Sequence, residues 1–159
     1  MANTISLRGS AAEAMVLSNG LTAVLIDVLC LTGAGIAITD WQKEILVRLA
    51  SHDAAILGDG FTGFDLAEIL NGLDPVEGAG FLSGVCSLAQ QVKIWSGLPY
   101  SPDRELLHSA LLRFKGLCQL AGGILPSAGK PFQSSHAYTR CERHGVYLHK
   151  EGCIFCNNY

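Results

Sequence analysis

The chain has 159 residues, of which 49% are hydrophobic and only 16% are charged, with a formal net charge of −3. This composition excludes a disordered chain, because enough apolar side chains are present to bury a core, and the length suits one domain with or without a small appendage. Before residue 127 seven Lys/Arg stand against twelve Asp/Glu, whereas from Ser127 onward the balance is four against two.

The apolar run from Leu21 to Ile38 predicts a buried helix. Ser18 and Asn19 can cap its start, apolar residues recur at helical spacing, and Gly33 is a natural stop. The run approaches the length of a membrane span, but a carboxylate such as Asp27 near the bilayer centre costs about 3 kcal/mol. We therefore expect a core helix and no membrane partner.

Four further helices are predicted downstream. Their expected ranges are about 40–57, 62–70, 75–92 and 101–122. Each follows residues that cap helix starts, namely Thr39 with Gln42, Thr62, Asp74 with Pro75, and Ser101 to Asp103. Convincing strand patterns are few. Residues 1–126 are therefore predicted to form a mainly α domain, a bundle of about five helices.

The order of helices from Asp40 to Lys93 resembles a helix-turn-helix or winged-helix core, with Thr62–Leu70 as the supporting helix and Pro75–Gln90 as the recognition helix. The resemblance implies a nucleic-acid-binding transcription regulator. Recognition helices usually present basic residues and amides to DNA, yet no basic residue precedes Lys93 on this helix. A platform for protein contacts is the alternative that fits this chemistry better.

A glycine pattern in the middle of the chain offers a third interpretation. Gly58, Gly60 and Gly63 form a G-x-G-x-x-G run that resembles the dinucleotide-binding fingerprint, with Ala54–Leu57 as the strand and Phe64 as the start of the helix. The fingerprint also needs a second strand ending in an acid, and the sequence offers only a fragment of one. A flexible loop between helices is the simpler explanation, and dinucleotide binding stays an alternative function.

Residues 127–135 are rich in proline, glycine, serine and glutamine, a composition that predicts a linker. The linker precedes a C-terminal module, residues 136–159, which contains too few apolar residues to fold alone. We expect a small β-hairpin there, held together by a bound metal ion.

Four candidate metal ligands lie in this module, in two close pairs. Cys141 and His144 form a C-x2-H pair, and Cys153 and Cys156 form a C-x2-C pair. Two ligands separated by two residues can bind one ion from a single turn, and four such donors suit tetrahedral zinc. Gly145 directly follows the first pair and tolerates the positive φ that such a turn needs at its exit, and Asn157 has the same place after the second pair.

These pairs resemble a zinc ribbon or a related knuckle-based zinc finger, within residues 141–157 only. The resemblance implies a structural zinc ion, because four protein ligands leave no open position for a reacting water. The commonest ribbons have a cysteine where this chain has His144, so His149 or His136 stays open as the fourth ligand. Tyr147 lies between the pairs and, together with Arg143 and Lys150, could form an aromatic and basic surface that binds RNA or DNA. The alternative is that these three residues are solvated hairpin residues without a binding role.

The other cysteines, Cys30, Cys86 and Cys118, stand singly in apolar surroundings and are expected to be buried and reduced. This usage favours the cytoplasm. No Ser-His-Asp, paired-carboxylate or P-loop spacing is evident, so we expect no enzymatic activity. The sequence predicts a non-catalytic, zinc-binding regulatory or adaptor protein whose body binds a protein partner or itself, with nucleic acid possible only at the basic tail.

Overall fold

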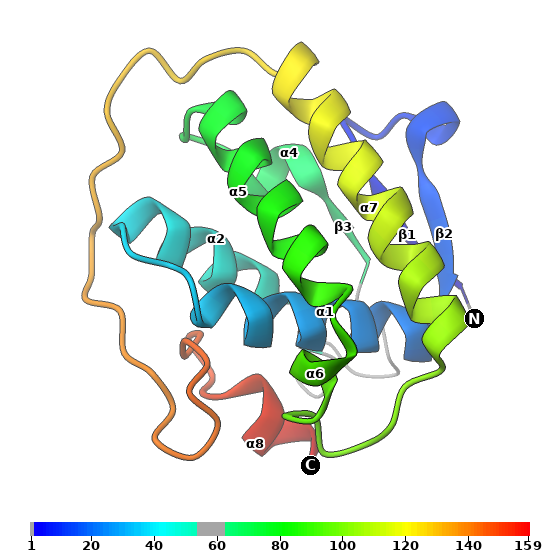
Figure 1. Ribbon diagram of the computed structural model, residues 1–159. Coiled ribbons are helices and arrows are strands. Elements are labelled where there is room, and N and C mark those ends of the chain that lie inside the picture. Colours follow the sequence, from blue (N-terminus) through cyan, green and yellow to red (C-terminus); the bar gives the residue numbers. More distant parts are fainter. Residues whose placement is uncertain (1, 54–62) are drawn as a thin grey trace.

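The computed structural model describes residues 2–53 and 63–159. It is mainly helical, as expected, with a small sheet at one side (Figure 1). The α-helices are α1 (Asn19–Ala34), α2 (Asp40–Ala50), α4 (Leu66–Ile69), α5 (Pro75–Ala89), α6 (Val92–Trp95), α7 (Arg104–Ile124) and α8 (Ile154–Asn158). The strands are β1 (Ala2–Ser6), β2 (Met15–Ser18) and β3 (Phe64–Asp65), with a 3-10 turn at Ala11–Glu13.

Helix α1 is the central helix of the fold. Its start is capped as predicted, since the Ser18 hydroxyl accepts a hydrogen bond from the Leu21 N–H at 3.2 Å. Ten of its residues are buried, among them Asp27. The helix runs across the ends of α5 and α7 in Figure 1 and contacts both. Within the described ranges, the structure contains no helix with the length and apolarity required to cross a bilayer.

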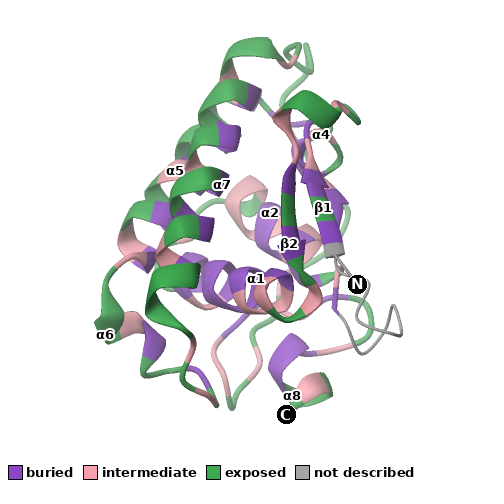
Figure 2. Ribbon diagram, turned by 90° about the vertical axis from the view of Figure 1, so that its right-hand side faces the viewer, coloured by how far each residue is buried: buried purple, intermediate pink, exposed green. Residues whose placement is uncertain are grey.

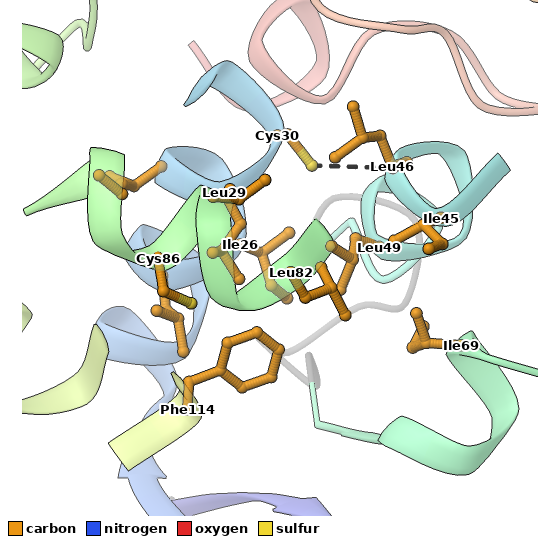
Figure 3. Packing of buried hydrophobic residues seen from close by; sticks show 14 of the residues in the cluster. Ile26, Leu29, Cys30, Ile45, Leu46, Leu49, Ile69, Leu82, Cys86 and Phe114 are labelled. Carbon is orange, nitrogen blue, oxygen red and sulfur yellow. Dashed lines mark hydrogen bonds between the residues drawn. The ribbon is translucent and has the colours of Figure 1, made fainter. Parts of the chain in front are cut away.

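Helices α5 and α7 pack against each other along their lengths and form the other half of the core. Asp74 and Asp103 cap them, each accepting backbone N–H bonds at 2.9 Å. Figure 3 shows how Leu82 from α5 and Phe114 from α7 meet apolar residues of α1 and α2. Cys30, Cys86 and Cys118 are buried and free, as predicted. A buried thiol in this setting behaves as a small apolar side chain.

The small sheet was not predicted. Its strand order is β2-β1-β3, with β2 antiparallel and β3 parallel to β1. Ile5 in β1 and Leu7 just after this strand are fully buried, so the N-terminal segment contributes to the core. Strands this short depend on partners far along the chain, which local sequence patterns do not reveal.

Several predicted helix limits were wrong. Helix α2 ends at Ala50 instead of continuing to residue 57. The helix expected over 75–92 ends at Ala89, and α6 begins at Val92 after a turn. The four-residue α4 begins at Leu66 and is capped by the carboxylate of Asp65. The candidate strand 54–57, Gly58, Gly60 and Thr62 lie outside the described residues.

The C-terminal segment packs on the helical body after a long connection with no regular secondary structure (Figure 1). Val146, Tyr147, Ile154 and Phe155 are buried within the same apolar cluster as the body. Figure 2 shows the start of α8 in the colour of buried residues. The expected hairpin is represented only by two isolated bridges, Arg140 with Tyr147 and His149 with Gly152, followed by the short helix α8.

Candidate metal centre

The structure brings the four predicted ligands together. The sulfurs of Cys141, Cys153 and Cys156 and a ring nitrogen of His144 all lie within 4.8 Å of one another. His144 Nδ1 is 3.6 Å from Cys141 Sγ, 3.6 Å from Cys153 Sγ and 3.4 Å from Cys156 Sγ. The sulfurs of Cys141 and Cys156 are 3.8 Å apart. The cluster can therefore hold a metal ion.

Four of the six donor separations match a tetrahedral zinc site. With Zn–S bonds of about 2.3 Å and a Zn–N bond of about 2.05 Å, tetrahedral geometry places two sulfurs about 3.8 Å apart, and a sulfur about 3.6 Å from the nitrogen. The observed distances of 3.4–3.8 Å agree with both values. Three thiolates and an imidazole are also the donor types that zinc prefers, so the cluster is compatible with zinc.

The first ligand pair is held by a tight turn. Gly145 donates its N–H to the Cys141 carbonyl at 2.8 Å and has the positive φ of 70° that was predicted. Although burial opposes ionisation of Cys141, the backbone N–H groups of His144 and Arg143 near its sulfur lower the pKa of the thiol to about 6. The turn thus favours the thiolate that a metal ion binds.

The second ligand pair lies at the start of a helix and not in a second knuckle. Cys153 is the N-cap residue of α8 and Cys156 lies in its first turn. Asn157 is helical, so the predicted positive φ at this residue is wrong. Burial raises the pKa of Cys153 to about 11, which means that a cation beside this sulfur is needed for it to ionise near neutral pH.

The alternative ligands His149 and His136 are occupied elsewhere. His149 is buried, its Nδ1 accepts the Glu151 N–H at 3.2 Å, and its Nε2 lies 3.0 Å from Asp53 Oδ2. Because Nδ1 is an acceptor, the ring proton is on Nε2 and is donated to Asp53. His136 Nε2 lies 3.7 Å from the carboxylate of Glu44. The metal cluster thus takes its imidazole from His144.

Asp53 binds the C-terminal segment to the body. Its carboxylate is fully buried and accepts hydrogen bonds from His149 Nε2 at 3.0 Å, Asn157 Nδ2 at 2.9 Å and Asn158 Nδ2 at 2.6 Å. Asn157 and Asn158 belong to α8, the same helix that carries Cys156. Sequence reasoning missed this role, because the donors follow Asp53 by about a hundred residues.

A second buried carboxylate, Asp27 of α1, holds the end of the same segment. Its Oδ2 accepts hydrogen bonds from the hydroxyls of Tyr100 at 2.6 Å and Tyr159 at 3.2 Å. Burial raises the pKa of Asp27 to about 6, and the two tyrosine hydrogen bonds oppose this shift only in part. The body therefore contacts the metal-binding segment through two buried acids.

The raised pKa of Asp27 predicts a pH effect on stability. A carboxyl group whose pKa is higher in the folded state stabilises the fold fully below its unfolded value of about 4, and this stabilisation is lost as the pH rises through about 6. Asp27→Asn removes the titration. As the pH falls from 7.5 to 5.5, the free energy of unfolding of the wild type should rise by about 1 kcal/mol relative to that of the variant. Urea unfolding at each pH measures this difference. A difference that does not change with pH would contradict this assignment.

The predicted aromatic and basic surface does not include Tyr147. This side chain is buried, its ring lies 4.9 Å from the Arg140 guanidinium carbon, and its hydroxyl accepts a hydrogen bond from Arg140 at 3.2 Å. Arg140 also donates to the carbonyl of Ala34 at the end of α1. The Tyr147 ring therefore helps to position the segment on the body and is not free to stack on a base. Arg143 and Lys150 are exposed.

The surroundings of Gly63 differ from those of a dinucleotide site. The residues after it form β3 and the four-residue α4 instead of a long helix. The Asp65 carboxylate caps α4 through the Ala67 N–H and also accepts bonds from the Arg8 and Gly9 N–H groups. An anion already occupies the helix start at which a pyrophosphate would bind.

Helix α5 packs against α7 and α1, and eight of its fifteen residues are buried. The opposite face is exposed and carries Val76, Gly80, Gly84 and Ser87. None of these residues is basic, so the exposed face lacks the side chains that usually contact bases and phosphates.

Comparisons with protein-family models, with curated proteins and with solved structures found no match.

Proposed function

We propose that the protein is a non-catalytic, zinc-binding adaptor or regulator that acts through protein contacts. The observation that carries this proposal is the set of four protein donors within 4.8 Å of one another, Cys141, His144, Cys153 and Cys156. A site filled by four side chains leaves no coordination position for a substrate or a reacting water, so the zinc has a structural role. The reducing cytoplasm is the compartment that suits free thiolate ligands.

The buried Asp53–His149 pair supports the non-catalytic part. Such a pair forms two of the three members of a hydrolytic triad, in which the second ring nitrogen faces the nucleophile. Here Nδ1 accepts the Glu151 N–H and Nε2 donates to Asp53, so both nitrogens are used internally. The ring is also buried. This pair is suited to holding the segment in place and not to proton transfer with a substrate.

Exposed apolar side chains on one side of α7 support protein contacts. Leu106, Leu120 and Ile124 are 55%, 37% and 41% exposed. The second and third follow Leu106 by 14 and 18 residues, close to whole numbers of helical turns, so all three lie on one side of the helix. Figure 2 shows exposed segments of α7 at the outside of the molecule. Exposed apolar side chains that share a face favour association with a partner or a second copy.

The experiment measures metal content and association together. We expect the purified chain to carry about one zinc per molecule, and to form a dimer or retain a specific protein partner. Leu106→Asp with Leu120→Asp should weaken that association about 30-fold, the effect of losing one hot-spot contact, while the zinc content stays the same. A zinc-free protein that zinc cannot refill would contradict the metal site. A monomer that retains no partner would contradict the adaptor role.

A further inference from the structure

The three thiols at the metal centre differ in exposure. Cys156 is exposed, Cys141 is half-buried and Cys153 is buried. The remaining cysteines, Cys30, Cys86 and Cys118, are buried in the helical body. An oxidant in solution therefore meets the thiol of Cys156 before that of any other cysteine. Reactivity also requires the thiolate form, which metal coordination supplies.

A second thiol lies close enough to resolve an oxidised Cys156. The sulfurs of Cys141 and Cys156 are 3.8 Å apart, and a disulfide bond of about 2.05 Å needs them to approach by roughly 1.7 Å. Cys141 lies in the connection before the short turn at Gly145, and Cys156 lies in a five-residue helix. Neither residue is anchored inside a long element, so a small rearrangement can bring the two sulfurs together.

We infer that Cys156 and Cys141 form an oxidation site for hydrogen peroxide, at which a disulfide replaces the bound metal ion. This inference rests on the proposed zinc site and adds a modification to it. The Cys156 thiolate attacks one peroxide oxygen, so that an S–O bond forms, the O–O bond breaks and hydroxide leaves. The Cys141 thiolate then attacks the sulfenic sulfur, so that an S–S bond forms and the S–O bond breaks, again with loss of hydroxide.

The step balances as a two-electron exchange. Two thiolates are oxidised to one disulfide, one peroxide is reduced to two waters, and two protons are taken up from solvent. The site then retains only His144 and Cys153 of its four donors, and its affinity for zinc is lost.

Loss of the metal ion releases the contacts that depend on α8. This helix has five residues, too few to be stable alone, and it carries the Asn157 and Asn158 side chains bound to Asp53. It also buries Ile154 and Phe155 against the body. Oxidation should therefore expose the apolar surfaces that α8 and the helical body now bury against each other.

The test treats the zinc-loaded full chain with hydrogen peroxide and follows zinc release with a colorimetric chelator. We expect about one zinc per chain to be released, together with one disulfide that peptide mass spectrometry maps to Cys141 and Cys156. The body cysteines should stay reduced. A thiol reductant with added zinc should restore the original metal content, because a disulfide is reversible whereas sulfinic acid is not.

Two matched variants separate the thiols. Cys156→His keeps a four-donor zinc site without the exposed thiol, and should release zinc at least roughly tenfold more slowly. Cys118→Ala removes a buried cysteine of the body that is not a ligand, keeps the Cys141–Cys156 pair and should release zinc like the wild type.

Disulfide mapping in the wild type identifies the oxidised cysteines even where a variant binds zinc poorly. A disulfide at Cys153, or zinc that stays bound under peroxide, would overturn the oxidation site and leave the metal site intact. A chain that never binds zinc would overturn the metal site itself.

Discussion

Replacing Cys153 by serine should abolish zinc binding and detach the C-terminal segment from the body. Structural zinc contributes an apparent binding free energy on the order of 10 kcal/mol to small metal modules. Loss of a ligand should reduce the affinity by more than the roughly 100-fold that supporting residues typically contribute. Two amides report the result by hydrogen exchange: the Cys141 N–H, bonded to the Val146 carbonyl at 2.8 Å, and the Asn157 N–H, bonded to the Cys153 carbonyl at 3.0 Å. Both should lose protection.

Cys118→Ala is the matched control, because it removes a buried thiol of α7 that is not a ligand. It should lower stability by about 1 kcal/mol or more through a small cavity, and it should keep full zinc content and amide protection in the segment. Chelation of zinc from the wild type should reproduce the effect of Cys153→Ser. If the Cys141 and Asn157 amides stay protected without metal, apolar burial alone holds the segment and the role assigned to zinc is wrong.

The parts of the fold that local chemistry determines were predictable from the sequence. Ser18, Asp74 and Asp103 cap helices where their side chains suggested, because a cap bonds to backbone groups only two or three residues away. The four metal ligands were recognisable for a similar reason, since each pair has its two donors within one turn. Gly145 also has the predicted positive φ.

The unpredicted parts depend on residues far apart in the chain. Strand β1 includes Ala2, Asn3 and Ser6, which do not favour strands, and it is stabilised by pairing with β2 and with the two-residue β3. The predicted extension of α2 to residue 57 followed Ile56, which continues the apolar spacing. Helix α2 instead ends at Ala50, three residues before Asp53.

The contacts between the metal-binding segment and the body also depend on residues far apart in the chain, and the sequence did not reveal them. His149 was considered as a ligand because histidine binds zinc, and only the distance to Asp53 reveals its actual partner. Asp27 stood out as a charge in an apolar helix, which favoured a core helix over a membrane span but did not identify Tyr100 and Tyr159 as its donors. Buried polar groups need partners, but the sequence does not say which ones.

Asp53→Ala should destabilise the protein and weaken its zinc binding at the same time. The substitution leaves the polar hydrogens of His149, Asn157 and Asn158 without the fully buried carboxylate that accepts them. Breaking a buried charged network of this kind costs about 3–5 kcal/mol. Since these donors lie on the segment that zinc organises, docking and metal binding strengthen each other, and the affinity for zinc should fall roughly 10–100-fold.

The coupling between Asp53 and the metal is measured by a double-mutant cycle with Cys153→Ser. We expect the cost of Asp53→Ala to shrink by about 1–3 kcal/mol in the Cys153→Ser background, because the donors are then already solvated in the undocked segment. Asp74→Ala is the matched control. It removes an exposed helix cap at the start of α5 that lies away from α8 (Figure 1), should cost about 1 kcal/mol, and should be additive with Cys153→Ser. Equal costs of Asp53→Ala in both backgrounds, with unchanged zinc affinity, would mean that Asp53 stabilises the body alone and does not connect it to the metal centre.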